Sequence, residues 1–503
     1  MNHIIQKQYL HVELNGTESD GMALQRSLPD MLQHRLLPAI EQVLERFTPQ
    51  EGHLFIERLE IDAGTMTLEQ LEHKLVESVA QALEKSLRGH TSPGEVSAMV
   101  ISGNTRYKTG QQSINEALAH FLKFGSLPWS FRLPDGATLE QIILDSWQDA
   151  EKSGVDPLAG CDEMLRTLAD VTARKRLVRQ FSPALLETLI SRLSPKDKAV
   201  MDGVLQTLRS SAMPSVDRKY FERLLWETAF AKLAEGRILT SMDLVSEAWR
   251  TMPVTATGHA ELARVLKLHW PGVTKRVPTK SEGMKKIKKS ITPRLSGLNK
   301  ASITDGHSGD REEICFEPTA ENLPGSDKKP IMRSTHPDAE EGLYIENAGL
   351  VLLHPFLPQF FTGLGIAGED KLLLPERALC LLHFLATGQV IAPEHELVLP
   401  KILCNVPLET PVESDVVLTL AEQEEATALL AAVTRHWDAL RNTSADGLRG
   451  TFLLRPGKVS LRGGDWLLMV ESRGFDVLLD QLPWGISMIK LPWMERLLWV
   501  EWK

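Results

Sequence analysis

The spacing of apolar residues predicts strands and helices in alternation at the start of the chain. Two stretches in which apolar and polar residues alternate, 9–14 and 54–61, predict strands, and a helix-spaced segment, 28–47, lies between them. A second amphipathic helix is predicted over residues 68–87. These patterns together predict a small N-terminal α/β unit, a β-α-β-α arrangement over residues 1–90.

Helical periodicity then continues almost without interruption over residues 110–270. A proline inside such a pattern ends one helix or begins the next, because it lacks an N–H and restricts the residue before it. Breaks between helices are therefore expected at Ser182-Pro183, Ser194-Pro195 and Met213-Pro214. We expect a helical domain of short antiparallel helices, without the fixed period of a solenoid.

Residues 271–342 differ from the rest in composition. They are rich in Lys, Ser, Thr, Gly and Pro, and they hold too few apolar side chains to offset the entropy of ordering. We predict a flexible, disordered linker. Its first half carries nine basic residues against the single acid Glu282, which favours either a solvated, self-repelling spacer or an electrostatic handle for an acidic surface or polyanion.

Mixed helical and strand patterns return over residues 343–503. Helices are predicted over 376–387 and 421–442, and Thr419 begins a TLAE sequence typical of a capping box. Short strands are predicted at 452–454, 459–461, 466–470 and in the terminal sequence LLWVEW. The chain is therefore predicted to be α+β, predominantly helical and multi-domain, with a mixed α/β C-terminal domain that depends on its last strand.

The C-terminal third is dense in aromatic and aliphatic residues. Leaving them in water would forgo roughly 25 cal/mol per Å² of apolar area, so they either build a core or dock on a partner. The motif Leu-Pro-Trp occurs three times, and its tryptophans are either buried turn anchors or docking anchors. The candidate partner-binding residues are Trp129, Phe356, Phe360, Trp484, Trp493, Trp499 and Trp502.

Composition and charge exclude several classes of protein. The formal net charge of -10 and the pI near 5.9 argue against nucleic acid as the main partner, because a phosphate backbone requires a concentrated basic surface. The N-terminus lacks a signal peptide, and His354, Pro355 and Pro358 interrupt the longest apolar run, so we expect no membrane span and a cytoplasmic location during synthesis.

The motifs that would carry catalysis are incomplete. GTESDG has the glycine spacing of a phosphate loop, but Met22 and Ala23 replace the lysine and hydroxyl residue that bind phosphate and magnesium. His395 and Glu396 begin an HExxH pattern, but Leu399 replaces the second histidine. We therefore predict no enzyme, no cofactor, no metal and no small-molecule substrate.

Isolated cysteines and histidines do not change this conclusion. No CxxC pair is present, so neither a zinc site nor a disulfide framework is indicated, and mostly buried thiols are expected. The histidines within apolar or helical stretches are interpreted as satisfied core or surface residues rather than ligands. They are His354, His383 and His436.

Seven segments form a distinctive combination. They are IERLEIDAG (56–64), FLKFGSLPW (121–129), IENAGLVLLHPFLPQFF (345–361), ERALCLLHFLATGQ (376–389), KILCNVPLETPV (401–412), HWDALRNTSADGLRGTFLLRPGKV (436–459) and LPWGISMIKLPWMERLLWVEW (482–502). In these segments the chain resembles the tape measure protein of extracellular contractile injection systems, the phage-tail-like particles. The resemblance implies a structural assembly role in length determination, with inner tube and baseplate or hub proteins as partners and no catalytic site.

A molecular ruler must span distance, and this chain is not one long helix. It contains 28 prolines, and a compact domain of about 150 residues has a radius of gyration of only about 15 Å. We therefore expect two docking ends separated by the linker, whose roughly 70 residues extend to at most about 230 Å. The alternative is a cytoplasmic assembly chaperone or baseplate adaptor that binds tube subunits transiently; a hydrolase is a more distant third.

Overall fold

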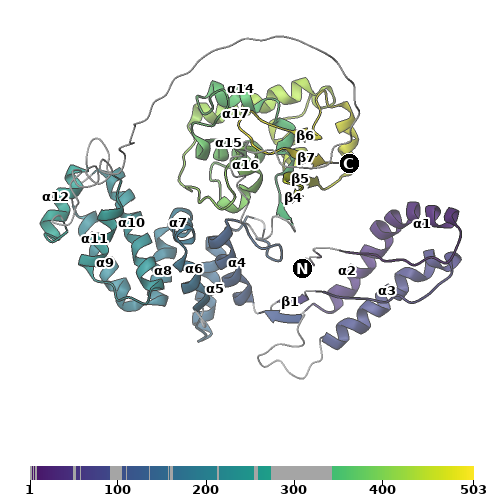
Figure 1. The fold of residues 1–503 in the computed structure, drawn as a ribbon, viewed down its shortest axis with the longest axis horizontal. Coiled ribbons are helices and arrows are strands. Elements are labelled where there is room, and N and C mark those ends of the chain that lie inside the picture. Colours follow the sequence, from purple (N-terminus) through teal and green to yellow (C-terminus); the bar gives the residue numbers. More distant parts are fainter. Residues whose placement is uncertain are drawn as a thin grey trace, which may run out of the picture.

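The computed structural model contains three separate hydrophobic cores along the chain (Figure 1). It describes residues 3, 5, 8–48, 53–56, 58–90, 105–108, 110–134, 136–156, 158, 162–211, 214–253, 259–273 and 342–502. No core residue is shared between clusters, so each unit buries its own apolar side chains. The predicted α+β, mostly helical, multi-domain class is confirmed; the predicted linker falls almost entirely outside the described residues.

The N-terminal unit is a helical arm with a two-stranded antiparallel sheet at its base (Figure 1). Its helical elements are α1 (Glu18–Met31), a π-helix (Leu32–Leu36), α2 (Leu37–Arg46) and α3 (Leu68–His90). Leu36, Val43, Leu83 and Leu87 are buried between α2 and α3, as the helical spacing predicted. Among the described residues of the arm this is the one buried cluster, so the stability of the arm depends on it.

The strand predicted over residues 9–14 is wrong. These residues carry no strand, and Tyr9 is 86% exposed. A strand requires a neighbour for its hydrogen bonds, and β1 (His53–Ile56) instead pairs antiparallel with β2 (Thr105–Lys108), which lies between the two predicted units 1–90 and 110–270. Alternation alone could not reveal which segment would supply the partner.

The middle unit is a stack of short helices, as predicted. These are α4 (Gly110–Phe124), α5 (Leu139–Lys152), α6 (Asp162–Ala169), α7 (Val171–Gln180), α8 (Pro183–Leu193), α9 (Pro195–Arg209), α10 (Ser215–Ala234), α11 (Ser241–Thr251) and α12 (Ala260–His269). Ser182 caps α8 and Pro195 begins α9, so these two proline breaks occur where they were expected. Trp270 and Val273 are buried in the same core, which therefore extends to the last described residue before the gap.

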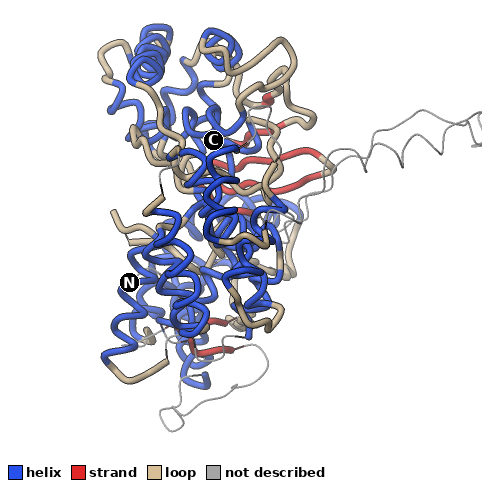
Figure 2. The backbone as a smooth tube through the Cα atoms, turned by 90° about the vertical axis from the view of Figure 1, so that its left-hand side faces the viewer, coloured by secondary structure: helices blue, strands red, loops and turns tan. Residues whose placement is uncertain are grey.

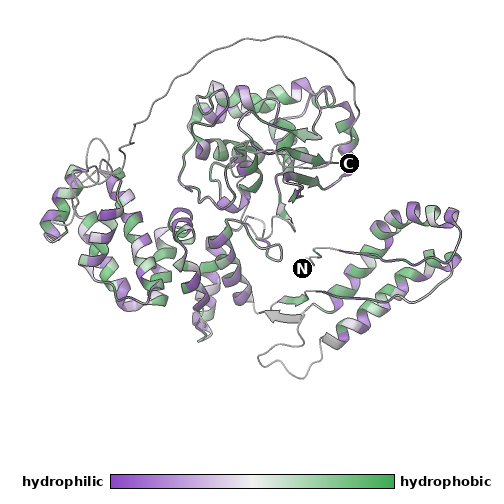
Figure 3. Cartoon of the chain, in the orientation of Figure 1, coloured by the Kyte–Doolittle hydropathy of each residue, from purple (hydrophilic) through white to green (hydrophobic). Residues whose placement is uncertain are grey.

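The C-terminal unit wraps helices around a five-stranded sheet. Its elements are β3 (Leu343–Ile345), a 3-10 helix (Ala348–Leu353), α14 (Leu357–Gly363), α15 (Pro375–Thr387), a 3-10 helix (Glu394–Glu396), α16 (Val398–Leu403), α17 (Leu420–His436), a 3-10 helix (Asp438–Leu440), α18 (Ala445–Leu448), a π-helix (Arg449–Leu453), β4 (Gly457–Arg462), β5 (Asp465–Val470), a 3-10 helix (Gly474–Gln481), β6 (Met488–Ile489) and β7 (Leu498–Glu501). The strand order is β3-β4-β5-β7-β6, and only the β5–β7 pair is parallel. Figure 2 shows the strands on one side of the unit with helices beside them, and Figure 3 shows the strands as strongly hydrophobic.

Local signals predicted most of this unit correctly. Thr419 caps α17 through the expected capping box with Glu422, the β4–β5 turn has Gly463 and Gly464 at positive φ, and the terminal strand forms. The strand predicted over 452–454 is wrong, because Phe452 and Leu453 end a π-helix. The Phe452 carbonyl packs closely against Gly349 in the 3-10 helix Ala348–Leu353. Tertiary packing here overrides the strand propensity.

Candidate docking surfaces

Most of the predicted aromatic anchors contribute to the C-terminal core rather than to the surface. Trp493 is 6% exposed, and its indole Nε1 donates to the Leu403 carbonyl at 2.8 Å. Trp484 is half-buried, and its Nε1 donates to the Leu352 carbonyl at 3.1 Å. Each indole N–H is thus satisfied inside the domain, as expected of a turn anchor.

The remaining predicted anchors divide between core support and exposure. Phe356 stacks edge-on against Trp484, and Phe360 and Trp502 are half-buried against the same core. Trp129 of the first Leu-Pro-Trp motif lies 5.8 Å, between ring centroids, from Phe55 in β1. Among the seven, Trp499 alone is classed as exposed, at 44% of its surface.

Trp499 belongs to an exposed apolar face of the C-terminal sheet. Its partner across β6 is Met488 and its partner across β5 is Leu467, and residues paired across neighbouring strands lie on one face. Met469 follows on the same face of β5, where Lys458 and Glu501 are its partners, and Tyr344 of β3 pairs with Lys458. We call Tyr344, Leu467, Met469, Met488 and Trp499 the sheet face.

The sheet face is open at every member except Leu467, which is 8% exposed, while the opposite face is packed. Met488 is 54% exposed and Met469 is 43% exposed. Val459, Leu468 and Leu498, which point the other way, are 0% exposed. An aromatic residue flanked by flexible methionines is typical of a protein-docking surface, because methionine adapts to different partner shapes.

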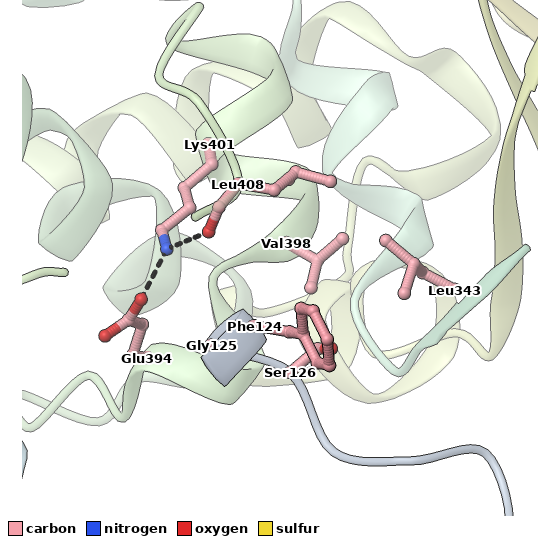
Figure 4. Close-up of a pocket in the computed structure, with 8 residues that line it drawn as sticks. All are labelled: Phe124, Gly125, Ser126, Leu343, Glu394, Val398, Lys401 and Leu408. Atoms are coloured by element: carbon pink, nitrogen blue, oxygen red, sulfur yellow. Dashed lines mark hydrogen bonds and ion pairs between the residues drawn. The ribbon is translucent and has the colours of Figure 1, made fainter. Parts of the chain in front are cut away.

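A second surface is already occupied: the helical unit is docked on the C-terminal unit through buried charges. Arg176 of α7 and Glu394 are each 0% exposed, and Arg176 Nε lies 3.0 Å from Glu394 Oε1. Lys401 of α16, 2% exposed, places Nζ 2.6 Å from the same oxygen and also donates to the carbonyls of Leu408 and Thr410 (Figure 4). We call this contact, with the segment 409–415, the junction.

Each side-chain nitrogen of Arg176 and Lys401 has a hydrogen-bond partner, which the low dielectric requires. Arg176 also donates to the carbonyls of Leu122 and Glu409, so its guanidinium joins α4, α7 and the junction segment. Burial lowers the pKa of Lys401, and the neighbouring Glu394 carboxylate opposes that change. The carboxylate between two cations thus offsets part of the free-energy cost of burying the charged lysine.

The helical unit recognises the segment 409–415 mainly through its main chain. Arg179 donates to the Pro411 carbonyl at 3.0 Å, and Gln180 donates to the Val412 carbonyl at 2.8 Å. Ser414 returns a hydrogen bond to the Arg179 carbonyl. Three side-chain ion pairs complete the contact, namely Arg179–Glu413 at 3.2 Å, Arg223–Glu413 at 2.8 Å and Arg223–Asp415 at 2.9 Å.

Gly125 permits the close approach of the two units. It ends α4 with φ of +78°, and a Cβ there would lie 2.5 Å from Glu394 Oε1. Figure 4 shows Phe124, Gly125 and Ser126 beside Glu394 and Val398. The segments FLKFGSLPW and KILCNVPLETPV, which lie on opposite sides of the gap, therefore meet at the junction.

The incomplete HExxH pattern has a structural explanation at the same place. His395 packs edge-on against Phe121 of the helical unit, and burial lowers its pKa. Glu396 accepts a hydrogen bond from Nε2 of His383 at 2.7 Å, which confirms His383 as a satisfied core histidine. In the described part of the chain no group of three or more His, Cys, Asp or Glu side chains could hold a metal ion.

Sequence reasoning did not identify Arg176, Glu394 or Lys401. The available signal was Lys401 itself, a single cation within the apolar run LVLPKILC, since buried lysines occur almost only with a partner. A cleft of about 340 Å³ opens beside the junction and is lined by Lys123, Phe124, Arg166 and Glu409 among others. No sequence motif pointed to it.

The fold and these surfaces define a multi-domain, mostly helical protein with an exposed apolar face on its C-terminal sheet. The family model for the contractile injection system tape measure protein matches residues 2–502. The chain therefore belongs to the contractile injection system tape measure protein family, as the resemblance predicted. The search of curated proteins and the search of solved structures return no match.

Family membership gives the chain a structural role in the assembly of a contractile injection particle, in contact with other particle components such as the tube. Within the described residues, no helix is long and apolar enough to cross a bilayer.

Proposed function

We propose that this chain is the tape measure that sets inner tube and sheath length, and that it acts by docking on tube and baseplate or hub subunits without catalysis. The observation that carries the docking role is the sheet face, an apolar patch that runs over β5, β7 and β6, centres on Trp499 and has Tyr344 beyond Lys458 of β4. Burying such a patch contributes roughly 25 cal/mol per Å². The chain is made in the cytoplasm and becomes part of the particle.

The span is supplied by residues 274–341, with or without lengthwise unpacking of the middle helices. The two units that flank these residues each have a core of their own, so they can act as separate ends when the junction between them opens. This arrangement makes particle length depend on the number of residues between Val273 and Gly342. The basic half of that segment remains a spacer in this proposal.

Charge introduced into the sheet face tests the docking role. Met469→Lys with Met488→Lys should reduce the amount of this chain in purified particles at least tenfold, because two cations then face the partner. The matched control is Val417→Lys with Leu420→Lys, two residues that are 73% and 76% exposed outside the sheet face. Quantitative mass spectrometry of particles gives the amounts, and normal incorporation of the sheet-face variant would refute this docking surface.

The same measurement separates the tape measure from an assembly chaperone. A chaperone or adaptor would use the sheet face transiently and leave, whereas a tape measure stays. The wild-type chain should therefore be present in finished particles at a constant low copy number per particle. Its absence from finished particles that still assemble only when the chain is supplied would favour the chaperone.

A further inference from the structure

We propose that the junction also forms between copies, so that the C-terminal unit of one chain docks on the helical unit of the next. This deepens the proposed function, on which its biological meaning rests, by naming a second copy of the chain as a partner. Its test uses the purified chain alone, so it can fail independently of the tape measure role.

The junction joins two units that fold around different cores. On one side lie Arg176, Arg179 and Gln180 of α7 together with Arg223 of α10; on the other lie Glu394, Lys401 and the segment 409–415. The chain connects the two sides only through residues 274–341. None of the contacts depends on that connection, so an identical junction can form when the two sides belong to different chains.

The chemistry of the junction resembles the binding of a peptide more than the packing of one core. Three hydrogen bonds from Arg176, Arg179 and Gln180 end on main-chain carbonyls of the loop segment 409–415, at 2.6, 3.0 and 2.8 Å. Such contacts fix the register of a segment through its backbone. The buried Glu394 carboxylate adds specificity, because a segment without it would leave Arg176 buried and unpaired.

Each copy offers its C-terminal unit to one neighbour and its helical unit to another. Docking between copies therefore joins two different surfaces and is heterologous. A heterologous contact closes into a ring or continues as an open chain of subunits. An open chain lets compact units span a distance that one copy cannot cover. The segment between the two sides, about 70 residues, reaches at most about 230 Å, which is ample for the helical unit of a neighbouring copy.

Concentration decides which form is populated. A tether of this length gives the docking within one chain an effective concentration on the order of 1 mM, so an isolated wild-type chain in dilute solution closes on itself. Docking between copies becomes visible when closure within the chain is blocked, or when copies are crowded to about the same concentration. The experiment is designed around that competition.

Two full-length variants with charge reversals on opposite sides of the junction provide the test. The first carries Arg179→Glu and Arg223→Glu, and the second carries Glu413→Arg and Asp415→Arg, all at side chains that are at least partly accessible. Like charges then oppose closure within either variant, whereas the C-terminal unit of the first and the helical unit of the second are both native. A mixture should therefore form a one-to-one dimer that neither variant forms alone.

The measurement is native mass spectrometry with light scattering after mixing at about 10 µM, where unmixed controls stay monomeric. The matched control pair carries Arg237→Glu with Arg250→Glu and Glu424→Arg with Glu425→Arg, surface charges outside the junction. Monomers in the mixture of junction variants, with helical content unchanged, would overturn the proposal. A dimer in the control mixture would overturn it equally.

A second pair of variants decides the matter if the reversed chains do not fold. One chain carries Arg223→Cys and the other carries Asp415→Cys, at an ion pair whose side chains are 29% and 54% exposed. Mixed at about 1 mM under oxidising conditions, they should give a disulfide-linked dimer at least tenfold above either variant alone. Equal amounts in the mixture and in the unmixed samples would overturn the proposal.

Discussion

Arg176 and Glu394 form an ion pair that is completely buried although the two residues belong to different hydrophobic cores. The Nε–Oε1 distance is 3.0 Å, and 217 residues of chain lie between them. A buried carboxylate that loses its partner is costly, because the remaining charge is neither solvated nor paired. The docking of the helical unit on the C-terminal unit therefore depends on this pair and on Lys401 beside it.

Arg176→Met should destabilise the protein strongly. The methionine fills much of the same space but leaves Glu394 with Lys401 as its only cationic partner and leaves the carbonyls of Leu122 and Glu409 without their donor. Breaking a buried pair in this way costs about 3–5 kcal/mol. Denaturant titration should show this loss, whereas the exposed control Arg237→Met should change stability by less than about 1 kcal/mol.

Gly125→Ala tests the close approach at the junction. Both Gly125 and Gly236 have positive φ, +78° and +67°, so alanine at either position costs about 1–2 kcal/mol of backbone strain. At Gly125 the new methyl group also meets the Glu394 carboxylate, whereas nothing lies within 4 Å at Gly236. The melting temperature should therefore fall further for Gly125→Ala than for Gly236→Ala, and equal shifts would mean that the two units do not touch there.

The N-terminus of α17 predicts a pH dependence. Hydrogen bonds from Arg377 and Thr419 lower the pKa of Glu422 from 4.5 to about 2. A carboxyl with a lower pKa in the folded state stabilises the fold above pH 4.5, and this contribution is lost as the pH falls toward 2. Thermal melts should show Glu422→Gln less stable than wild type at pH 7, with the gap closing below pH 4.5; Glu424→Gln, at an exposed position, is the control.

Removal of residues 498–503 should unfold the C-terminal unit. β7 lies between β5 and β6, so its loss leaves β6 without a strand partner, opens one edge of β5 and removes from the core Leu498, which is 0% exposed. Limited proteolysis should then cut within residues 342–497 while fragments of the helical unit persist. Resistance of the shortened chain equal to that of wild type would show that the strand is dispensable.

Local patterns predicted the elements that depend on near neighbours. The capping box at Thr419, the glycine turn before β5 and the helices of the middle unit all follow from residues a few positions apart. The prediction of a strand over residues 9–14 was wrong, because alternation of apolar and polar residues does not show which segment will pair with it. In the structure β1 pairs with Thr105–Lys108 instead. Pairing of distant strands is a property of the whole fold.

The candidate docking surfaces likewise contain residues that the local sequence identified and residues that it could not identify. Trp499 was among the candidates because tryptophan at the end of an apolar run is either core or anchor, and only the sheet register shows that it faces outward beside Met488. The same sequence argument nominated Trp493, which the fold buries. Arg176 and Glu394 could not be paired from sequence, because no local spacing relates residues in two different units.

The length distribution of particles assembled with lengthened and shortened versions of this chain tests the tape measure role most directly. Polar insertions and deletions between residues 274 and 341 leave the three cores untouched, so assembly itself should continue. Electron microscopy should then show mean particle length changing by a constant increment per residue in both directions. Particles of unchanged length, with the altered chain incorporated at the normal copy number, would contradict the claim that this chain sets length through that segment.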